Sequence, residues 1–343
     1  MPRLFRALLA TAALLPLAAS GQTPAAPPYQ AAQHQYGAPL IDRASAQELA
    51  VLADQGVSIE HDRPPGQALA EHRRLDTALA ALQPQRHGVV DAYVVAVALD
   101  SDPVFGREAR EAGRVLARRY GAAGHTIVLA GTDGSRDSTL PMGSPANITA
   151  ALARVAELID PDEDVLVLYT TSHGAPWGIV YNDGDQGFGA ISPTRLWTTL
   201  STLGIRNRLL LISACFSGVF VPLLQSDTTA ILTAASADRT SFGCQADQDW
   251  TFFGDATINH ALRKPQPFSA AAAEARGLIG GWERQGQLTP SQPQLSIGPG
   301  AARWLAALEA HLPPATPGVG RPATGALGAA SEHLREGNRT RQK

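Results

Sequence analysis

A cysteine and a histidine each stand directly after an apolar segment of the sequence. Cys215 follows Leu-Leu-Leu-Ile-Ser-Ala, and His173 follows Val-Leu-Val-Leu-Tyr-Thr-Thr-Ser. A thiol is a weak nucleophile at neutral pH until a base or a cation favours the thiolate. An imidazole can supply that base and can then donate a proton to a leaving amine. The two residues therefore predict a nucleophilic cysteine that works with a histidine.

The two apolar segments are predicted to be neighbouring strands of one sheet. Each is an apolar run without helical periodicity, which is typical of a strand buried on both faces. Residues 164–171 and residues 209–213 are consecutive predicted strands, and consecutive strands are usually neighbours. Parallel neighbours lie ~4.8 Å apart. His173 and Cys215 should then emerge side by side at the carboxyl edge of the sheet, where open α/β sheets place their active sites.

Gly174, directly after the histidine, is predicted to complete the chemistry. Because it has no side chain, its backbone N–H can approach a substrate carbonyl oxygen. Together with the N–H of Cys215 it could form an oxyanion hole.

Structural roles are the alternatives for these residues. His173 could be a core histidine, and Cys215 could be a small buried side chain or the partner of Cys244 in a disulfide, since the chain has 2 cysteines. Their position at predicted strand ends favours the catalytic roles. Cys244, which follows Phe242-Gly243, is expected to be a buried free thiol.

Strands and helices alternate through the rest of the chain, which predicts a mostly parallel sheet with helices on both faces. A hairpin turn is predicted at residues 182–185, where Asp183 and Asp185 could alternatively suggest calcium, although a complete calcium loop is absent. Further strands are expected at residues 91–99, 125–130 and 229–235. Helices are expected at residues 44–55, 67–82, 106–120, 145–159, 193–203, 255–263, 269–285 and 301–312.

The ends of the chain differ in composition from its middle. Residues 1–21 have arginines, then an apolar stretch and then small residues, which predicts a signal peptide and an exported, periplasmic or secreted protein. Residues 22–66 are expected to be a linker with an N-terminal helix, and residues 67–312 the folded domain. Residues 313–343 are rich in Pro, Gly and Ala and then charged, which predicts a disordered tail.

Charge and hydropathy exclude several classes of partner. The formal net charge is −3 and no basic stripe is present, so nucleic acid is not an expected partner. No apolar run reaches the ~18 residues of a membrane span, so stable membrane insertion is not expected. No cofactor or metal motif is found, and the sequence leaves the oligomeric state open.

The order of these motifs resembles the caspase-type clan of cysteine peptidases. A strand followed by Ser-His-Gly precedes a strand followed by Ser-Ala-Cys-Phe-Ser-Gly, and the histidine lies 215 − 173 = 42 residues before the cysteine. Within the clan, the chain is most similar to the legumain-type family of asparaginyl endopeptidases and related transamidases. Downstream, Thr-Ala-Ala-Ser begins at Thr233, Ser-Phe-Gly-Cys ends at Cys244, and Phe-Phe-Gly-Asp ends at Asp255, in an order similar to that family. The similarity covers roughly residues 89–285.

The resemblance implies a three-layer caspase-like fold and a role for each matching residue. His173 resembles the general base, Cys215 the nucleophile, and Gly174 the glycine of the oxyanion hole. Ser241 and Asp255 fall where the family lines its substrate pocket.

Three positions depart from the family pattern. Ser213 occupies the position of a pocket glutamate, and Arg107 is the candidate for the pocket arginine although it is displaced in the alignment. Asp102 is the candidate for the residue that orients the histidine. These departures affect the expected preference for asparagine, but they do not affect the predicted catalytic pair of His173 and Cys215.

The sequence as a whole predicts an exported cysteine endopeptidase that cleaves peptides or proteins, with Asn or Asp as the expected residue before the cleaved bond. A transamidase or ligase that uses the same thioester is one alternative. A caspase-fold module that binds peptide without catalysis is the other.

Overall fold

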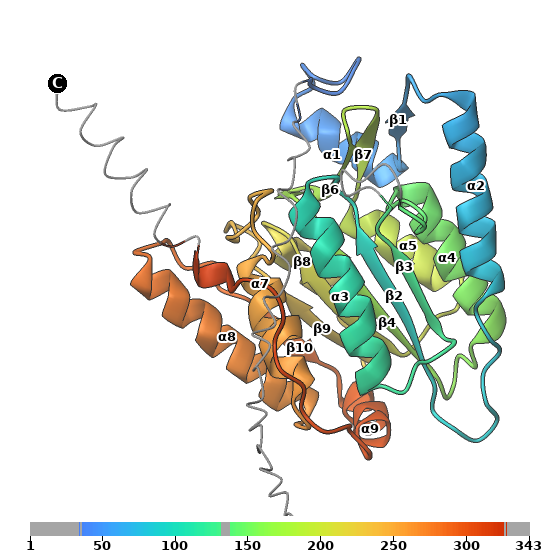
Figure 1. Ribbon diagram of the computed structural model, residues 1–343, viewed down its shortest axis with the longest axis vertical. Helices are drawn as coiled ribbons and strands as arrows, with labels where there is room; N and C mark the ends of the chain where they lie inside the picture. The colour runs from blue at the N-terminus through green and yellow to red at the C-terminus, as the bar shows by residue number, and fades with distance from the viewer. Residues whose placement is uncertain (1–33, 35, 132–137, 326, 328–343) are drawn as a thin grey trace, which may run out of the picture.

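The computed structural model describes residues 34, 36–131, 138–325 and 327. Its main sheet has the strand order β10-β9-β8-β4-β2-β3 (Figure 1). All neighbouring strands are parallel except the edge strand β10, which is antiparallel to β9. The strands are β2 (Ala92–Ala98), β3 (Thr126–Leu129), β4 (Val165–Thr171), β8 (Arg208–Ser213), β9 (Thr229–Thr233) and β10 (Leu295–Ile297).

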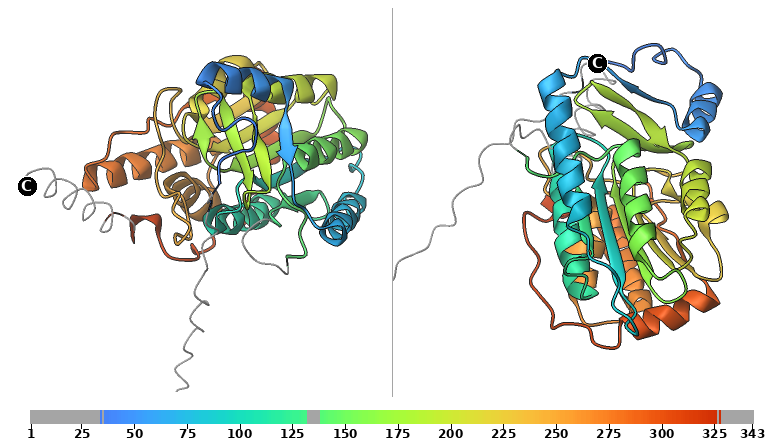
Figure 2. Two further views of the ribbon diagram at one scale, coloured as in Figure 1. Left: turned by 90° about the horizontal axis from the view of Figure 1, so that it is seen from above. Right: turned by 90° about the vertical axis from the view of Figure 1, so that its right-hand side faces the viewer.

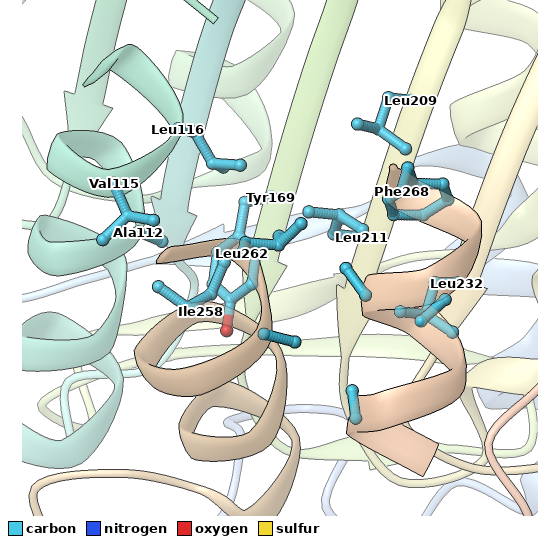
Figure 3. Packing of buried hydrophobic residues seen from close by; sticks show 14 of the residues in the cluster. Ala112, Val115, Leu116, Tyr169, Leu209, Leu211, Leu232, Ile258, Leu262 and Phe268 are labelled. Carbon is cyan, nitrogen blue, oxygen red and sulfur yellow. The ribbon is translucent and has the colours of Figure 1, made fainter. Parts of the chain in front are cut away.

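Helices α3, α8 and α9 cover one face of this sheet. Apolar side chains of α3 and α8 interdigitate with those of the strands, as Leu116, Leu211 and Phe268 show (Figure 3). All three of these side chains are almost completely buried, so this face is a close-packed core. The helical elements here are α3 (Pro103–Arg119), α7 (Phe252–Gly254), the π-helical turn η2 (Asp255–His260), the 3₁₀ turn η3 (Ala261–Arg263), α8 (Phe268–Gln285) and α9 (Pro299–Leu308).

The other face of the sheet is covered by α2, α4, α5 and α6, as the second view of Figure 2 shows. Ser144 and Ser192 cap α4 and α5 by accepting N–H bonds from the first turn, and a proline follows each of them. The elements are α2 (Pro65–Ala80), α4 (Pro145–Leu158), α5 (Pro193–Thr202), η1 (Ser217–Phe220) and α6 (Val221–Leu224). The predicted three-layer arrangement of helices on both faces is therefore confirmed.

A second, small antiparallel sheet lies at the carboxyl end of the main sheet (Figure 1). The hairpin expected at residues 182–185 is present, and β6 and β7 are joined by a turn at residues 184–186. The small sheet also includes Gly174, directly after His173. Asn182 of this hairpin pairs with Asp100, which fastens the small sheet to the loop after β2. The strands are β1 (Ser58–Glu60), β5 (Gly174–Ala175), β6 (Gly178–Asp183) and β7 (Gly187–Ile191), and α1 (Ala46–Gln55) packs beside them.

Several boundaries differ from the sequence-based expectation. The short edge strands β1 and β10 were not predicted, because three residues are too few to show a pattern. The helix expected over residues 255–263 is a π turn followed by a 3₁₀ turn. Strand β1 pairs with β7, so the segment expected to be a linker contributes to the fold up to residue 66.

The C-terminal segment also departs from the expectation of a disordered tail from residue 313. The carbonyl oxygen of Val319 accepts a hydrogen bond from the Trp250 indole at 2.9 Å, and Ala323 is fully buried in the 3₁₀ turn η4 (Ala323–Gly325). The tail was expected from composition alone, which does not reveal these docking contacts. The predicted signal peptide, residues 1–21, lies outside the described residues. None of the described helices is long and apolar enough to span a membrane.

Candidate active site

Cys215 stands on a sharp turn at the carboxyl end of β8. The next residue, Phe216, has a φ of 57°, which is a left-handed conformation that a bulky residue rarely adopts. Its N–H donates to the Arg239 carbonyl oxygen at 2.7 Å, which helps to hold the turn. Because the chain turns immediately after the strand, the Cys215 side chain stays at the sheet edge and remains partly exposed.

The sulfur of Cys215 is contacted by the turn at residues 241–244. The Ser241 N–H donates to it at 3.3 Å, and the Ser241 hydroxyl oxygen lies 3.6 Å away. Cys244, the hydrogen bonds from Ser241 and the charge of His173 together lower the pKa of the Cys215 thiol to about 6, although burial opposes the shift. The thiolate is therefore the main form at neutral pH.

The cysteines are both free in this structure. The alternative that Cys215 forms a disulfide with Cys244 is therefore wrong for this form of the protein. Cys244 is free, as expected, but it is partly rather than fully buried. Its interaction with Cys215, together with burial, raises the pKa of Cys244 well above its ordinary value.

His173 lies at the end of the neighbouring strand, as predicted. In the parallel register of β4 and β8, Thr171 is opposite Ser213, which brings the residues that follow these strands to the same edge. The imidazole rests with its edge against Phe105, with 5.0 Å between ring centroids, and 42% of the side chain is exposed. Strand pairing thus brings His173 and Cys215, the candidate base and nucleophile, to one edge.

Asp102 is the acidic partner of His173. Its carboxylate lies 3.6 Å from the imidazole Nε2, and its role in orienting the histidine stays a prediction. Burial lowers the pKa of His173, but the hydrogen bond to Asp102 and the negative charges of Asp100, Asp102 and Cys215 raise it above its ordinary value. The structure therefore favours an imidazolium beside a thiolate.

Gly174 lies against the backbone of the nucleophile. A Cβ at this position would overlap the carbonyl oxygen of Cys215, so only glycine fits. The ladder bond of this hairpin runs from the Val180 N–H to the His173 carbonyl oxygen at 3.0 Å, which leaves Gly174 at a non-hydrogen-bonded position of the pair. Its N–H is therefore not used by the ladder, as an oxyanion hole requires.

The sequence did not predict a cluster of charged groups that adjoins Asp102. The His34 Nε2 lies 3.1 Å from Asp100 and 3.7 Å from Asp102, and its Nδ1 lies 3.1 Å from Asp185. Within the described part of the chain, His34, Asp100 and Asp102 are one group that offers three metal-ligand atoms within 4.8 Å of one another. In the structure the His34 imidazole forms an ion pair with each of the two carboxylates.

The residues expected to line the substrate pocket have different surroundings. Ser241 contacts the Cys215 sulfur, whereas Ser213 is 2% exposed and donates a hydrogen bond to Glu108 at 3.0 Å. Asp255 is fully buried and accepts hydrogen bonds from Asn259 at 2.8 Å and from the Ala323 N–H at 2.7 Å.

Arg107 donates to the carbonyl oxygen of Ala246 at 2.8 Å and lies 3.5 Å from the Asp249 carboxylate. These contacts fasten the loop before α7 to α3. The substrate-binding roles of Arg107, Ser213, Ser241 and Asp255 stay predictions, and for Asp255 the structure adds a contact that anchors the C-terminal segment.

Glu108 is a further buried group that the sequence analysis did not single out. It is fully buried beneath Ser213, and one carboxylate oxygen accepts hydrogen bonds from Tyr169, from Thr171 at 2.8 Å and from Ser213. The other oxygen accepts the Thr251 N–H at 2.8 Å. Glu108, which comes from α3, therefore places a carboxylate directly beside the Ser213 hydroxyl. The signal that could have found it is a glutamate within the apolar face of a helix.

Comparison with known families agrees with this geometry. Residues 146–273 match the model of the Peptidase C13 family, the family of legumain-type cysteine peptidases. The matched segment contains both strands of the site, His173 and Cys215. The resemblance to the legumain-type peptidases is thereby confirmed over these residues, and the mixed α/β architecture is that of a caspase-like fold. No curated protein matched the chain.

Proposed function

We propose that the protein is an endopeptidase that uses Cys215 as its nucleophile and His173 as its general acid and base. The family match supports cysteine peptidase activity. The observation that carries the mechanism is the pairing of β4 with β8, which places His173 at the same edge as Cys215, whose pKa is about 6. A buried core histidine and an inert cysteine would not account for a raised imidazole pKa beside a lowered thiol pKa.

The reaction follows from these positions. The Cys215 thiolate attacks the carbonyl carbon of a peptide bond, and the negative charge develops on the carbonyl oxygen beside the N–H groups of Gly174 and Cys215. The His173 imidazolium then gives its proton to the leaving amine, and the carbon–nitrogen bond breaks to leave a thioester. The neutral imidazole takes a proton from water, which attacks the thioester and releases the acid product with a restored thiolate.

A substrate residue of Asn or Asp before the cleaved bond is part of this proposal. Ser241 beside the nucleophile supports a polar pocket wall, and the buried Glu108 carboxylate holds the Ser213 hydroxyl in place. Cleavage of a peptide library, read by mass spectrometry, tests the preference. A consistent preference for aliphatic residues at this position would contradict it.

The proposal also includes export, for which the sequence of residues 1–21 is the support. N-terminal sequencing of the protein recovered outside the cytoplasm should find a chain that begins near residue 22. A full-length chain that remains in the cytoplasm would contradict export and leave the peptidase activity open to test.

Replacement of the nucleophile tests the mechanism. Cys215→Ala should abolish cleavage of all peptide substrates, and its unfolding temperature should stay close to that of the wild type because the side chain is partly exposed. The exposed Thr198→Ala on α5 is the matched control and should keep full activity. Turnover by the Cys215→Ala variant would overturn the assignment. A wild-type Cys215 that iodoacetamide does not alkylate at pH 6–7 would instead favour the non-catalytic binding module.

A further inference from the structure

A small cavity lies at the opposite end of α3 from the candidate dyad. The helix begins directly after Asp102, and because its 17 residues span about 25 Å, its last turn lies far from His173. The cavity has a volume of about 170 Å³. Pockets for substrates and cofactors of ordinary size have roughly 300–1,000 Å³, so this cavity suits a smaller ligand. The proposed peptidase mechanism does not use it.

Three separate segments of the chain line the cavity, and two of them are basic. They are the last turns of α3, the turn η3 with the residue after it, and the C-terminal segment, which leaves α9 and passes the end of α3 (Figure 1). One lining side chain, that of Glu111, is acidic. Five lining side chains are cationic, namely Arg114, Arg118, Arg119, Arg263 and Lys264.

The carboxylates around the cavity do not balance these cations. Arg118 forms no ion pair with any described residue, and it donates to the carbonyl oxygen of Pro314 at 3.2 Å. The other four cations share three carboxylates, so two positive charges are left over. The pairs are Glu111 with Arg114 and with Arg263, Glu309 with Arg119, and Glu274 with Lys264.

Two of the guanidinium groups also have a buried N–H without a partner. The Arg119 side chain is 2% exposed and the Arg263 side chain is 7% exposed. The Nε atoms of both are buried and form no hydrogen bond with any described residue. A buried donor without an acceptor is costly, and in folded proteins such a group is normally met by an ordered water or a bound ion. The unused donors therefore point to a ligand that accepts hydrogen bonds.

A purely structural role accounts for part of this arrangement. Arg118 and Arg119 stand in the last turn of α3, where a positive charge is favourable beside the free carbonyl groups of the helix. Arg119 also donates to the carbonyl oxygen of Lys264 at 2.9 Å, which fastens η3 to α3. These roles leave the two Nε N–H groups unused, and they do not require that Arg263 lines the same cavity.

We propose that this cavity binds a small oxyanion with the charge and shape of phosphate. A phosphate group presents acceptor oxygens in several directions, which matches donors that come from both α3 and η3. Guanidinium groups bind it through paired, charge-assisted hydrogen bonds. Since Arg118 donates to Pro314 and Arg263 to Thr316 at 3.3 Å, the anion also holds the C-terminal segment against α3. This inference goes beyond the peptidase function and does not depend on it.

The first test is the unfolding temperature of the full chain in sodium phosphate, with sodium chloride at equal ionic strength as the reference. The unfolding temperature should rise with phosphate, by about 5 °C at a concentration about 100 times the Kd. An equal rise in chloride would mean that salt only screens the cationic groups, and it would overturn the proposal.

Isothermal titration calorimetry identifies the source of the anion. Inorganic phosphate should bind at one site per chain. Glycerol 3-phosphate carries the same group on a larger molecule, so its binding at the same site would show that the cavity accepts phosphate monoesters. Binding of inorganic phosphate alone would show that the cavity takes the free anion. If neither compound binds, the proposal is overturned.

A variant of an exposed lining residue tests the location. Arg118→Gln should fold, because the side chain is exposed, and it should raise the Kd for phosphate by roughly tenfold through the loss of a charge-assisted hydrogen bond. Adding Arg114→Gln, which is also exposed, should raise the Kd further. The matched control is Arg73→Gln, an exposed arginine of α2 on the other face of the sheet, which should leave the Kd unchanged. An unchanged Kd in the Arg114→Gln, Arg118→Gln double variant would overturn the proposal.

Hydrogen exchange locates the site in the unaltered protein. The Thr316 N–H donates to the Arg263 carbonyl oxygen at 3.2 Å, and the anion would hold both sides of this contact. Peptides that contain Thr316 should therefore exchange more slowly in phosphate, whereas peptides from β4 and β8 should not change. Slower exchange that is confined to other parts of the molecule would mean that the anion binds elsewhere, and the proposal would fail.

Discussion

The two halves of the candidate dyad are held in different ways. Cys215 is surrounded by one turn, whose Ser241 N–H lies 3.3 Å from the sulfur. His173 has 42% of its side chain exposed, and its acidic partner Asp102 lies 3.6 Å away. Asp102 is shared in turn with His34. The ionisation of Cys215 thus depends on one partly buried turn, whereas the protonation of the imidazole depends on the carboxylates of Asp100 and Asp102.

Among the variants that test this difference, removal of the His173 imidazole should have the largest effect on activity. We expect His173→Ala to lower kcat by roughly 10²–10⁴-fold, the usual contribution of a general acid and base. Because the turn still stabilises the thiolate, Cys215 should remain alkylated by iodoacetamide below neutral pH. Steady-state kinetics and the alkylation profile check the two statements. A thiol that becomes unreactive in this variant would show that the histidine, and not the turn, ionises the cysteine.

Gly174→Ala tests the backbone between the two halves. The added methyl group would overlap the carbonyl oxygen of Cys215, so either this carbonyl or the strand that carries the glycine must move. Loss of one oxyanion donor typically costs about 10²–10³-fold in kcat. We expect a loss of that size with a smaller change in KM. Unchanged kcat in a folded variant would place the oxyanion hole elsewhere.

Asp102→Asn should lower the pKa of His173 and leave the pKa of Cys215 unchanged. The raised pKa of His173 means that the imidazolium persists to higher pH, so kcat/KM should fall as pH rises through that pKa and as pH falls through about 6, the pKa of Cys215. The variant loses a negative charge beside His173. The alkaline limb of the pH profile of kcat/KM should therefore move to lower pH, and the acid limb should stay in place.

At the alkaline side, loss of a hydrogen bond worth about 1–2 kcal/mol corresponds to roughly a 5–30-fold fall in kcat/KM. The matched control is Asp54→Asn, an exposed residue on α1, which should leave both limbs in place. A shift of the acid limb in Asp102→Asn would mean that Asp102 also affects the ionisation of Cys215.

Strand patterns predicted the part of the site that depends on sheet topology. The apolar runs before His173 and Cys215 specify parallel neighbours, and the parallel pairing of β4 with β8 brings both residues to one edge. Gly174 could be predicted for the same reason, because it follows the histidine directly. This information is local in sequence, so periodicity and position were sufficient.

The supporting contacts could not be predicted in this way. Glu108 approaches Ser213 from a helix 105 residues earlier, and Ser241 approaches the Cys215 sulfur from a turn 26 residues later. Ala323 reaches Asp255 across 68 residues. The contacts of Glu108, Ser241 and Ala323 depend on how helices and loops dock on the sheet, which a single sequence does not encode as a pattern.

The contact of His34 with Asp102 leads to the prediction with the smallest effect. The hydrogen bond that His34 donates to Asp100 raises the pKa of His34 from 6.5 to about 9; burial opposes the shift, and the charges of Asp100 and Asp102 and the hydrogen bond to Asp185 support it. Because the folded pKa is the higher one, this contact stabilises the fold fully below about pH 6.5 and is lost as pH rises through about 9. At neutral pH the His34 cation therefore offsets part of the negative charge that His173 experiences.

His34→Gln removes that cation, so the pKa of His173 should rise and the alkaline limb of kcat/KM should move to higher pH, opposite to the shift in Asp102→Asn. The change in rate should be no more than about fivefold, the ratio given by about 1 kcal/mol, which is the upper end for partly exposed ion pairs. His72→Gln, an exposed histidine on α2, is the control and should leave the limb in place. A shift of the limb to lower pH in His34→Gln would show that His34 supports the imidazolium through contacts other than its charge.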